Sequence, residues 1–111
     1  LLKRDLEAYY EQFKKPIIMF EFGAEAIEGM HSLPSVAFSE EYQTDFLREY
    51  CRIFDELPYV QGELVWNFAD FMTKQGTIRV NGNRKGVFTR ERQPKSAAFY
   101  LKERWQNKIE K

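Results

Sequence analysis

The stretch PIIMFEFG, residues 16–23, carries a carboxylate at the end of an otherwise apolar run. Glu21 stands between Phe20 and Phe22, two residues before the glycine that ends the run. In parallel α/β proteins, ligands bind beyond the carboxyl ends of the strands. A carboxylate placed there between aromatic rings is expected to be partly desolvated, as many catalytic carboxylates are. The position is equally compatible with a structural ion pair to an arginine across the end of the sheet.

Trp66 lies near the end of a second run, VQGELVWNFA, and is followed by Asn67 and Asp70. An indole at the end of a strand offers a flat apolar surface that can stack on a sugar ring. The alternative is a large aromatic residue that only fills the end of the fold, and residue type alone favours that alternative.

A third group of candidates lies in the glycine-containing loop RVNGNRKG, residues 79–86. The guanidinium of Arg79, the amide of Asn83 and the ammonium of Lys85 are suited to hold a carboxylate. The loop lacks the spacing of a phosphate-binding P-loop. Two alternatives stay open. One is a solvated basic hairpin, and the other is a nucleic-acid surface that continues through Arg90, Arg92 and Lys95.

Helical periodicity and breaker residues predict the elements that position these candidates. Ser39 is expected to cap the second of three helices, which ends before Pro58, and Pro94 is placed in the first turn of the third. The predicted order is helix 2–13, strand 16–22 buried on both faces, loop 23–38, helix 40–57, strand 60–69, loop 70–93 and a last helix with Ala97, Leu101, Trp105 and Ile109 on its inner face.

This order predicts an α/β fold in which two parallel strands are joined through a helix. Two strands alone leave open edges and an uncovered face. We therefore expect residues 1–111 to be one incomplete piece of a larger sheet, such as the last quarter of a (β/α)8 barrel, completed by the remainder of that domain. Without that completion the piece is expected to self-associate, and a homo-oligomer is predicted.

Composition excludes several classes of partner. The 17 Lys and Arg residues balance 17 Asp and Glu residues, so net charge predicts no nucleic-acid partner, and no apolar run is long enough to predict a membrane partner. Cys51, the only cysteine, favours a reducing compartment, and we expect a cytoplasmic location. His31 is the only histidine, and neither a metal site nor another cofactor is predicted.

Four segments together closely resemble the C-terminal end of the β-glucuronidases: FEFGAEAIEGMHS, SEEYQ, GELVWNFADFMT and NGNRKGVFTRERQPKSAAFYLKERW. These enzymes belong to glycoside hydrolase family 2, which also contains the β-galactosidases. The resemblance runs from about Lys15 to Trp105 and includes the loop lengths between the motifs. It implies a TIM-barrel catalytic domain, to which this chain contributes the seventh and eighth strands and the last helices.

The resemblance also implies roles for single residues. The nucleophile of the family lies in an E-[YF]-G motif after strand seven, which here gives Glu21, followed by phenylalanine where tyrosine is more common. The asparagine and lysine of the N-x-K element, which read the glucuronate carboxylate, fall on Asn83 and Lys85. Arg79 and Trp66 match positions that line the same pocket.

The resemblance further implies that the full protein is a retaining β-glucuronidase acting on glucuronides. Such an enzyme needs a second carboxyl group about 5–5.5 Å from its nucleophile. The Asn-Glu pair that carries the family's acid/base does not occur in this chain, so these 111 residues alone are expected to be inactive. The alternatives are a non-catalytic carbohydrate-binding or interaction fragment, and another family 2 glycosidase such as a β-galactosidase.

Overall fold

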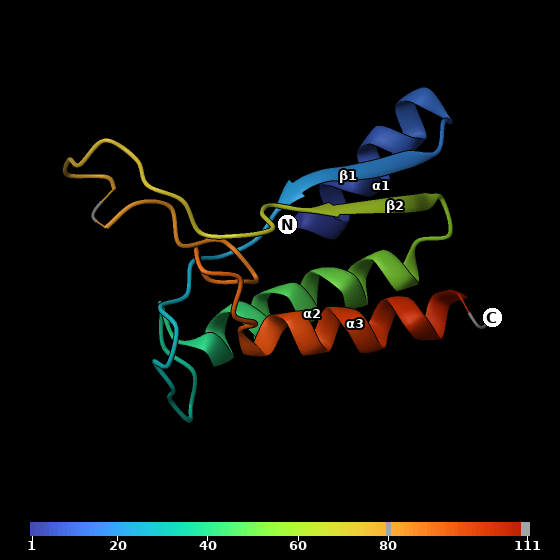
Figure 1. Cartoon of the computed structure of the whole chain (residues 1–111). Coiled ribbons are helices and arrows are strands. Elements are labelled where there is room, and N and C mark those ends of the chain that lie inside the picture. Colours follow the sequence, from blue (N-terminus) through green and yellow to red (C-terminus); the bar gives the residue numbers. More distant parts are fainter. Residues whose placement is uncertain (80, 110–111) are drawn as a thin grey trace.

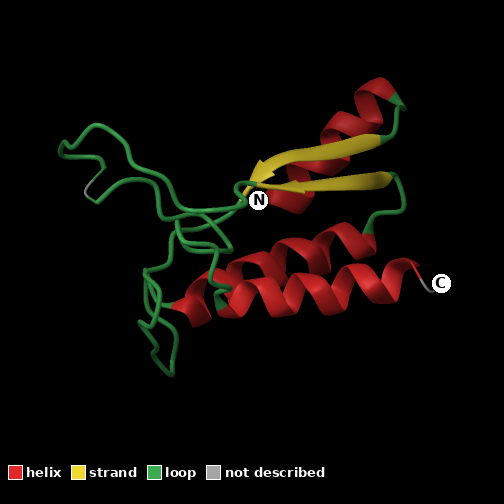
Figure 2. Ribbon diagram, in the orientation of Figure 1, coloured by secondary structure: helices red, strands yellow, loops and turns green. Residues whose placement is uncertain are grey.

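The computed structural model describes residues 1–79 and 81–109 of the chain. Helices and strands alternate in the predicted order, and a long loop leaves the end of each strand toward which its arrow points (Figures 1 and 2). This confirms the predicted α/β organisation. The elements are α1 (Leu2–Phe13), β1 (Ile17–Phe22), α2 (Glu40–Glu56), β2 (Val60–Val65) and α3 (Ser96–Ile109).

The two strands pair in parallel, as predicted. Because parallel strands end at the same edge, the residues after them meet there, and the Trp66 N–H donates to the Phe22 carbonyl at 2.9 Å. β2 is shorter than the predicted strand 60–69. After Trp66 the backbone pairs with the glycine-containing loop instead of with β1, since the Asn67 N–H donates to the Lys85 carbonyl at 3.2 Å.

The helices pack against one face of this small sheet. Apolar side chains from all three helices and from β1 form a single core, whose buried members include Leu6, Phe22, Leu47, Phe54 and Leu101. No described residue covers the other face, where Ile18 is 62% and Phe20 66% exposed. The prediction that the first strand is buried on both faces is therefore wrong for this chain, because its helices cover one face only.

The predicted boundaries of α2 are confirmed. The Oγ of Ser39 accepts a hydrogen bond from the Tyr42 N–H at 3.1 Å, which satisfies one of the free donors at the start of the helix. The helix ends at Glu56, before Pro58. Within the described residues, no helix has the length and apolar character needed to cross a membrane.

α3 differs from its prediction at both ends. It begins at Ser96 rather than at Pro94, which lies in a short bridge to Phe88. Ala97 is buried as predicted, but Ile109 is 84% exposed, because nothing in residues 1–79 and 81–109 covers the last turn of the helix. The predicted inner face is therefore confirmed in the first half of α3 and wrong at its end.

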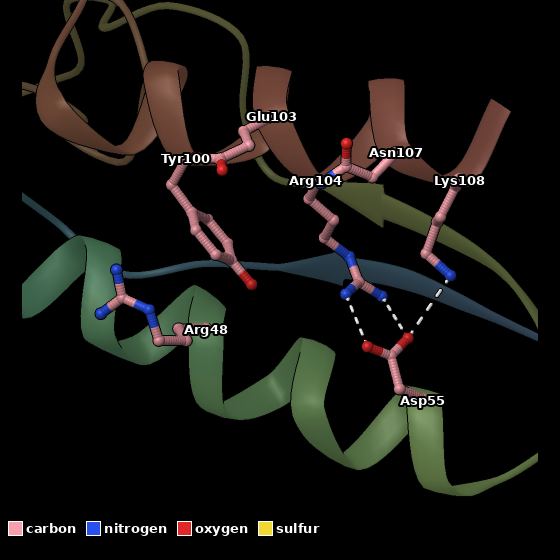
Figure 3. Close-up of a pocket in the computed structure, with 7 residues that line it drawn as sticks. All are labelled: Arg48, Asp55, Tyr100, Glu103, Arg104, Asn107 and Lys108. Atoms are coloured by element: carbon pink, nitrogen blue, oxygen red, sulfur yellow. Dashed lines mark hydrogen bonds and ion pairs between the residues drawn. The ribbon is translucent and has the colours of Figure 1, made fainter. Parts of the chain in front are cut away.

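An ion-pair network joins α2, α3 and β2. It borders a hollow of about 890 Å³ between the two helices (Figure 3). Arg104 of α3 donates to both carboxylate oxygens of Asp55, at 2.9 and 2.8 Å, and to both oxygens of Glu63 at the same two distances. Lys108 adds a longer contact to Asp55 at 3.4 Å. None of the predicted site residues lines this hollow, and Asp55, Arg104 and Lys108 are paired with one another across it, so we assign it a structural role.

Candidate active site

Glu21 has an unusual backbone conformation at the end of β1. Its φ is 63°, in the left-handed region that residues with a side chain seldom adopt, and the pairing with β2 shifts register between Phe20 and Phe22. Strict alternation would place Glu21 on the face of Met19, toward the helices. The irregularity places Phe22 there instead, where its ring stacks on that of Tyr50 with 5.7 Å between centroids.

This irregularity keeps the carboxylate out of the apolar core. Phe22 is 4% exposed, whereas Glu21 is exposed, so the predicted partial desolvation is absent from this chain by itself. The alternative of an arginine partner also gains no support from the glycine-containing loop, whose two arginines pair with Glu25 and Glu28. A left-handed residue costs about 1–3 kcal/mol and such residues gather at functional sites. Lys14, Phe38, Asn81 and Arg92 also have positive φ, so the backbone supports Glu21 as a candidate only together with its place at the end of the strand.

Three of the five predicted site residues border one hollow of about 280 Å³ at the carboxyl ends of the strands: Glu21, Trp66 and Lys85. The strand ends approach closely here, since a Cβ on Gly23 would overlap the carbonyl oxygen of Trp66. The indole of Trp66 is 37% exposed and meets the Phe71 ring edge-on, with 6.3 Å between centroids. Part of the indole surface is thus free to contact a ligand.

Asn83 holds the backbone that carries Lys85. Its side chain is buried, and its Oδ1 accepts a hydrogen bond from the Lys85 N–H at 2.9 Å. Its own backbone is fixed by two hydrogen bonds to Phe71, at 2.8 and 3.2 Å. In this structure Asn83 therefore acts on the position of Lys85 and does not line the hollow itself.

The structure does not bring Arg79 to the hollow. Its guanidinium forms an ion pair with Glu25, in the loop after β1. Arg84 is paired with Glu28, and Lys95, one of the cations counted toward a nucleic-acid surface, is completely buried. The alternative of a continuous nucleic-acid surface is therefore not supported, because Arg79 and Arg84 are paired with carboxylates and Lys95 is enclosed.

The buried polar side chains that hold the loops around the site were not identified from the sequence. Gln43 of α2 is 1% exposed, and its Nε2 donates to the carbonyls of Ala24 at 3.2 Å and Gly86 at 3.0 Å. A signal existed for this residue, because it stands four residues before Leu47 on the buried face of the helix. Asp70 and Lys95 are also buried, and nothing in the sequence marks that lysine as an interior residue.

We expect the pKa of His31 to lie above the ordinary histidine value of about 6.5. Its Nδ1 lies 2.7 Å from Glu41 Oε2, and Glu40 is 3.8 Å from its Nε2. The hydrogen bond and charge of Glu41 favour the protonated ring and so raise the pKa. The pair stabilises this loop below the unfolded pKa, and the contribution is lost as pH rises through the raised pKa.

An NMR titration of the ring, assigned with His31→Gln, measures this pKa directly. Glu41→Gln should return it toward the ordinary value. A His31 pKa that is the same with and without the Glu41 carboxylate would contradict the pairing.

Parallel strands linked through a helix, with the candidate side chains gathered at the carboxyl ends of the strands, match the active-site face of (β/α)8 barrels. Comparison with known families agrees. The family model described as "Glycosyl hydrolases family 2, TIM barrel domain" matches residues 1–109. The chain belongs to this family of glycoside hydrolases.

The relatives that this chain resembles are β-glucuronidases. It is 57% identical over 101 residues to the enzyme of Paenibacillus borealis and 54% identical over 106 residues to that of Homo sapiens. These alignments cover 91% and 94% of this chain, but only 17% and 16% of the two relatives. The chain therefore spans less than a fifth of their length.

Solved structures give the same result. The chain superimposes on the β-D-glucuronidase of Dictyoglomus thermophilum with a TM-score of 0.92 at 57% identity, covering 95% of this chain and 18% of that one. The β-glucuronidase of Ruminococcus gnavus in complex with uronic isofagomine matches with a TM-score of 0.88 at 50% identity, over 94% of this chain and 18% of that one. The chain thus has the fold of one part of a TIM-barrel domain.

Proposed function

We propose that the full-length protein is a retaining β-glucuronidase, and that this chain supplies the nucleophile and the carboxylate-reading loop from the last strands of its barrel. The observation that carries the proposal is that Glu21 and Lys85 border the same hollow at the carboxyl ends of paired parallel strands. The β-glucuronidase relatives support a glucuronide substrate over a galactoside. The cytoplasmic location and the homo-oligomer inferred from the sequence stay predictions.

Glu21 would act as the nucleophile of a double displacement. Its carboxylate attacks the anomeric carbon while the glycosidic C–O bond breaks and the leaving oxygen receives a proton from a second carboxyl group. That group, about 5–5.5 Å away, would come from another segment of the domain. Water, deprotonated by the same group, then attacks the covalent intermediate and frees glucuronic acid with its β configuration. Completion of the barrel would also provide the desolvation that Glu21 lacks here.

The remaining residues would bind the sugar. The ammonium of Lys85 would pair with the C6 carboxylate, and the indole of Trp66 would stack on the ring. The Oδ1 of Asn83 accepts the hydrogen bond from the Lys85 N–H, so the side-chain amide hydrogens of Asn83 would be the donors to the sugar. Arg79 would contact the sugar only after its ion pair with Glu25 is broken.

Lys85→Ala in the full-length protein tests the substrate assignment. A hydrogen bond between charged groups is worth about 1.5–3 kcal/mol, so kcat/KM for a β-glucuronide should fall roughly 10- to 150-fold. Residual hydrolysis of the matching β-galactoside should change little, because it has no C6 carboxylate. Lys102→Ala removes an exposed lysine of α3 and should alter neither rate. Equal losses on both sugars would refute a carboxylate-reading role for Lys85.

A further inference from the structure

Lys95 is a buried cation that the proposed chemistry does not use. It lies immediately before α3, and its side chain is completely enclosed. The Nζ donates to the carboxylate Oδ1 of Asp70 at 2.9 Å, to the Ala26 carbonyl at 2.7 Å and to the Arg84 carbonyl at 3.2 Å. All three ammonium hydrogens thus have acceptors, which come from the loop after β1 and the loop after β2.

Asp70 completes the contact to the glycine-containing loop. The residue is 4% exposed, and its Oδ1 also accepts a hydrogen bond from the Gly86 N–H at 2.9 Å. Gly86 permits this approach, because a Cβ there would overlap the Asp70 amide nitrogen. The buried pair of Lys95 and Asp70 therefore forms hydrogen bonds to two peptide groups of that loop.

Those two peptide groups flank Lys85. The Arg84 carbonyl precedes it and is held by Lys95, and the Gly86 N–H follows it and is held by Asp70. The backbone of Lys85 is also fixed, by Asn83 at its N–H and by Asn67 at its carbonyl. Because the peptide groups on both sides of Lys85 are hydrogen-bonded, its Cα has a defined position, from which the side chain can place its ammonium in the hollow.

The energetics of the pair also fit a positioning role. Burial lowers the pKa of Lys95, and the hydrogen bond and charge of Asp70 oppose that shift and favour the charged form. A buried ion pair is seldom the most stable way to fill an interior. The directional contacts made here, to one carboxylate and two carbonyls, could not be made by an apolar side chain.

We propose that Lys95 and Asp70 are positioning residues that set the selectivity of the site for a carboxylate-bearing sugar by holding the backbone on both sides of Lys85. Neither residue touches the substrate. The inference rests on the proposed function, because it assumes that Lys85 reads the C6 carboxylate. It adds that a buried ion pair, Lys95 with Asp70, determines the position of the Lys85 ammonium.

Binding of two iminosugars to the full-length protein tests the proposal without depending on turnover. One is uronic isofagomine, and the other is isofagomine, which carries a hydroxymethyl group in place of the carboxylate. Lys95→Met should raise the Kd for uronic isofagomine by about 10- to 100-fold, as expected for a misplaced binding group. The Kd for isofagomine should stay within about threefold, since it makes no ion pair to Lys85. A purely structural role would weaken both ligands alike.

Two further variants guard against a misfolded protein. Lys95→Met leaves the buried Asp70 carboxylate with only a longer contact to a cation, the Arg84 guanidinium at 3.5 Å. The double variant Lys95→Met with Asp70→Asn is therefore measured beside it. The double variant removes both charges and keeps an acceptor for the Gly86 N–H. It should show the same selective loss of uronic isofagomine binding. Lys102→Met, which removes an exposed lysine of α3, should leave both Kd values unchanged.

The outcomes distinguish the positioning role of Lys95 and Asp70 from the carboxylate-reading role of Lys85 on which it rests. If Lys85→Ala leaves the ratio of the two Kd values unchanged, the carboxylate-reading assignment itself fails. If Lys85→Ala collapses the ratio but a folded Lys95 variant keeps it, only the positioning role is overturned. Parallel weakening of both ligands in the folded double variant overturns it as well.

Discussion

Glu21→Ala in the full-length protein is expected to lower kcat for an aryl β-glucuronide by about 10⁴-fold or more, the scale reached when a covalent nucleophile is removed. The reason is that no covalent intermediate can form once the carboxylate is gone. Glu7→Ala, which removes an exposed carboxylate from α1, should have no effect on the rate. Retention of more than a tenth of the activity by Glu21→Ala would show that another group attacks the sugar.

Azide extends this test to the mechanism. In Glu21→Ala the space below the anomeric carbon is open, so azide can form the C–N bond as the C–O bond to an activated phenolate breaks. The product should be the α-glucuronosyl azide, because only one displacement takes place. Formation of the β-azide, or rescue that is equally strong in the unsubstituted protein, would contradict a nucleophile at this position.

The sequence was sufficient to predict the elements and the edge at which the candidates meet. Ser39 and Pro58 delimit α2 because capping and helix breaking are local properties of one or two residues. The convergence of Glu21, Trp66 and Lys85 follows from a rule of topology, since parallel strands bring their carboxyl ends to one edge. Neither prediction needs a detailed account of packing.

The features that could not be predicted depend on packing between distant segments. The local sequence around Glu21 predicts an ordinary extended strand. The left-handed φ of Glu21 depends on the packing of Phe22 against Phe54 of α2, which the local sequence does not reveal. Lys95 carries no sign of burial, since lysine is ordinarily an exposed residue and its three acceptors lie as far as 69 positions away. The burial of β1 on both faces was predicted from its unbroken apolar run, and it was wrong because Ile18 and Phe20 lie on a face that the helices of this chain do not cover.

Arg104→Met should strongly weaken the packing of α3 against α2 and β2. Its side chain is 9% exposed and that of Glu63 is 12% exposed, so the substitution leaves a buried carboxylate without its main partner. Breaking such a pair costs about 3–5 kcal/mol. Hydrogen exchange of the α3 amides in the full-length protein should therefore accelerate by roughly 10²- to 10³-fold or more. Lys108→Met, which breaks an exposed pair to Asp55, should change exchange by only a few fold.

The pH dependence of this effect distinguishes a lost ion pair from lost packing. In the unsubstituted protein, burial tends to raise the pKa of Glu63, but hydrogen bonds from Arg104 and Trp105 outweigh it and the pKa is lowered. The stability contributed by Glu63 is therefore present above the ordinary glutamate pKa and lost as pH falls through the lowered one. Without Arg104, burial should dominate and raise that pKa. The α3 amides of Arg104→Met should then gain protection as pH falls from 7 toward 5, where those of the unsubstituted protein do not. Equal protection changes in both proteins would indicate that Arg104 acts through its packing alone.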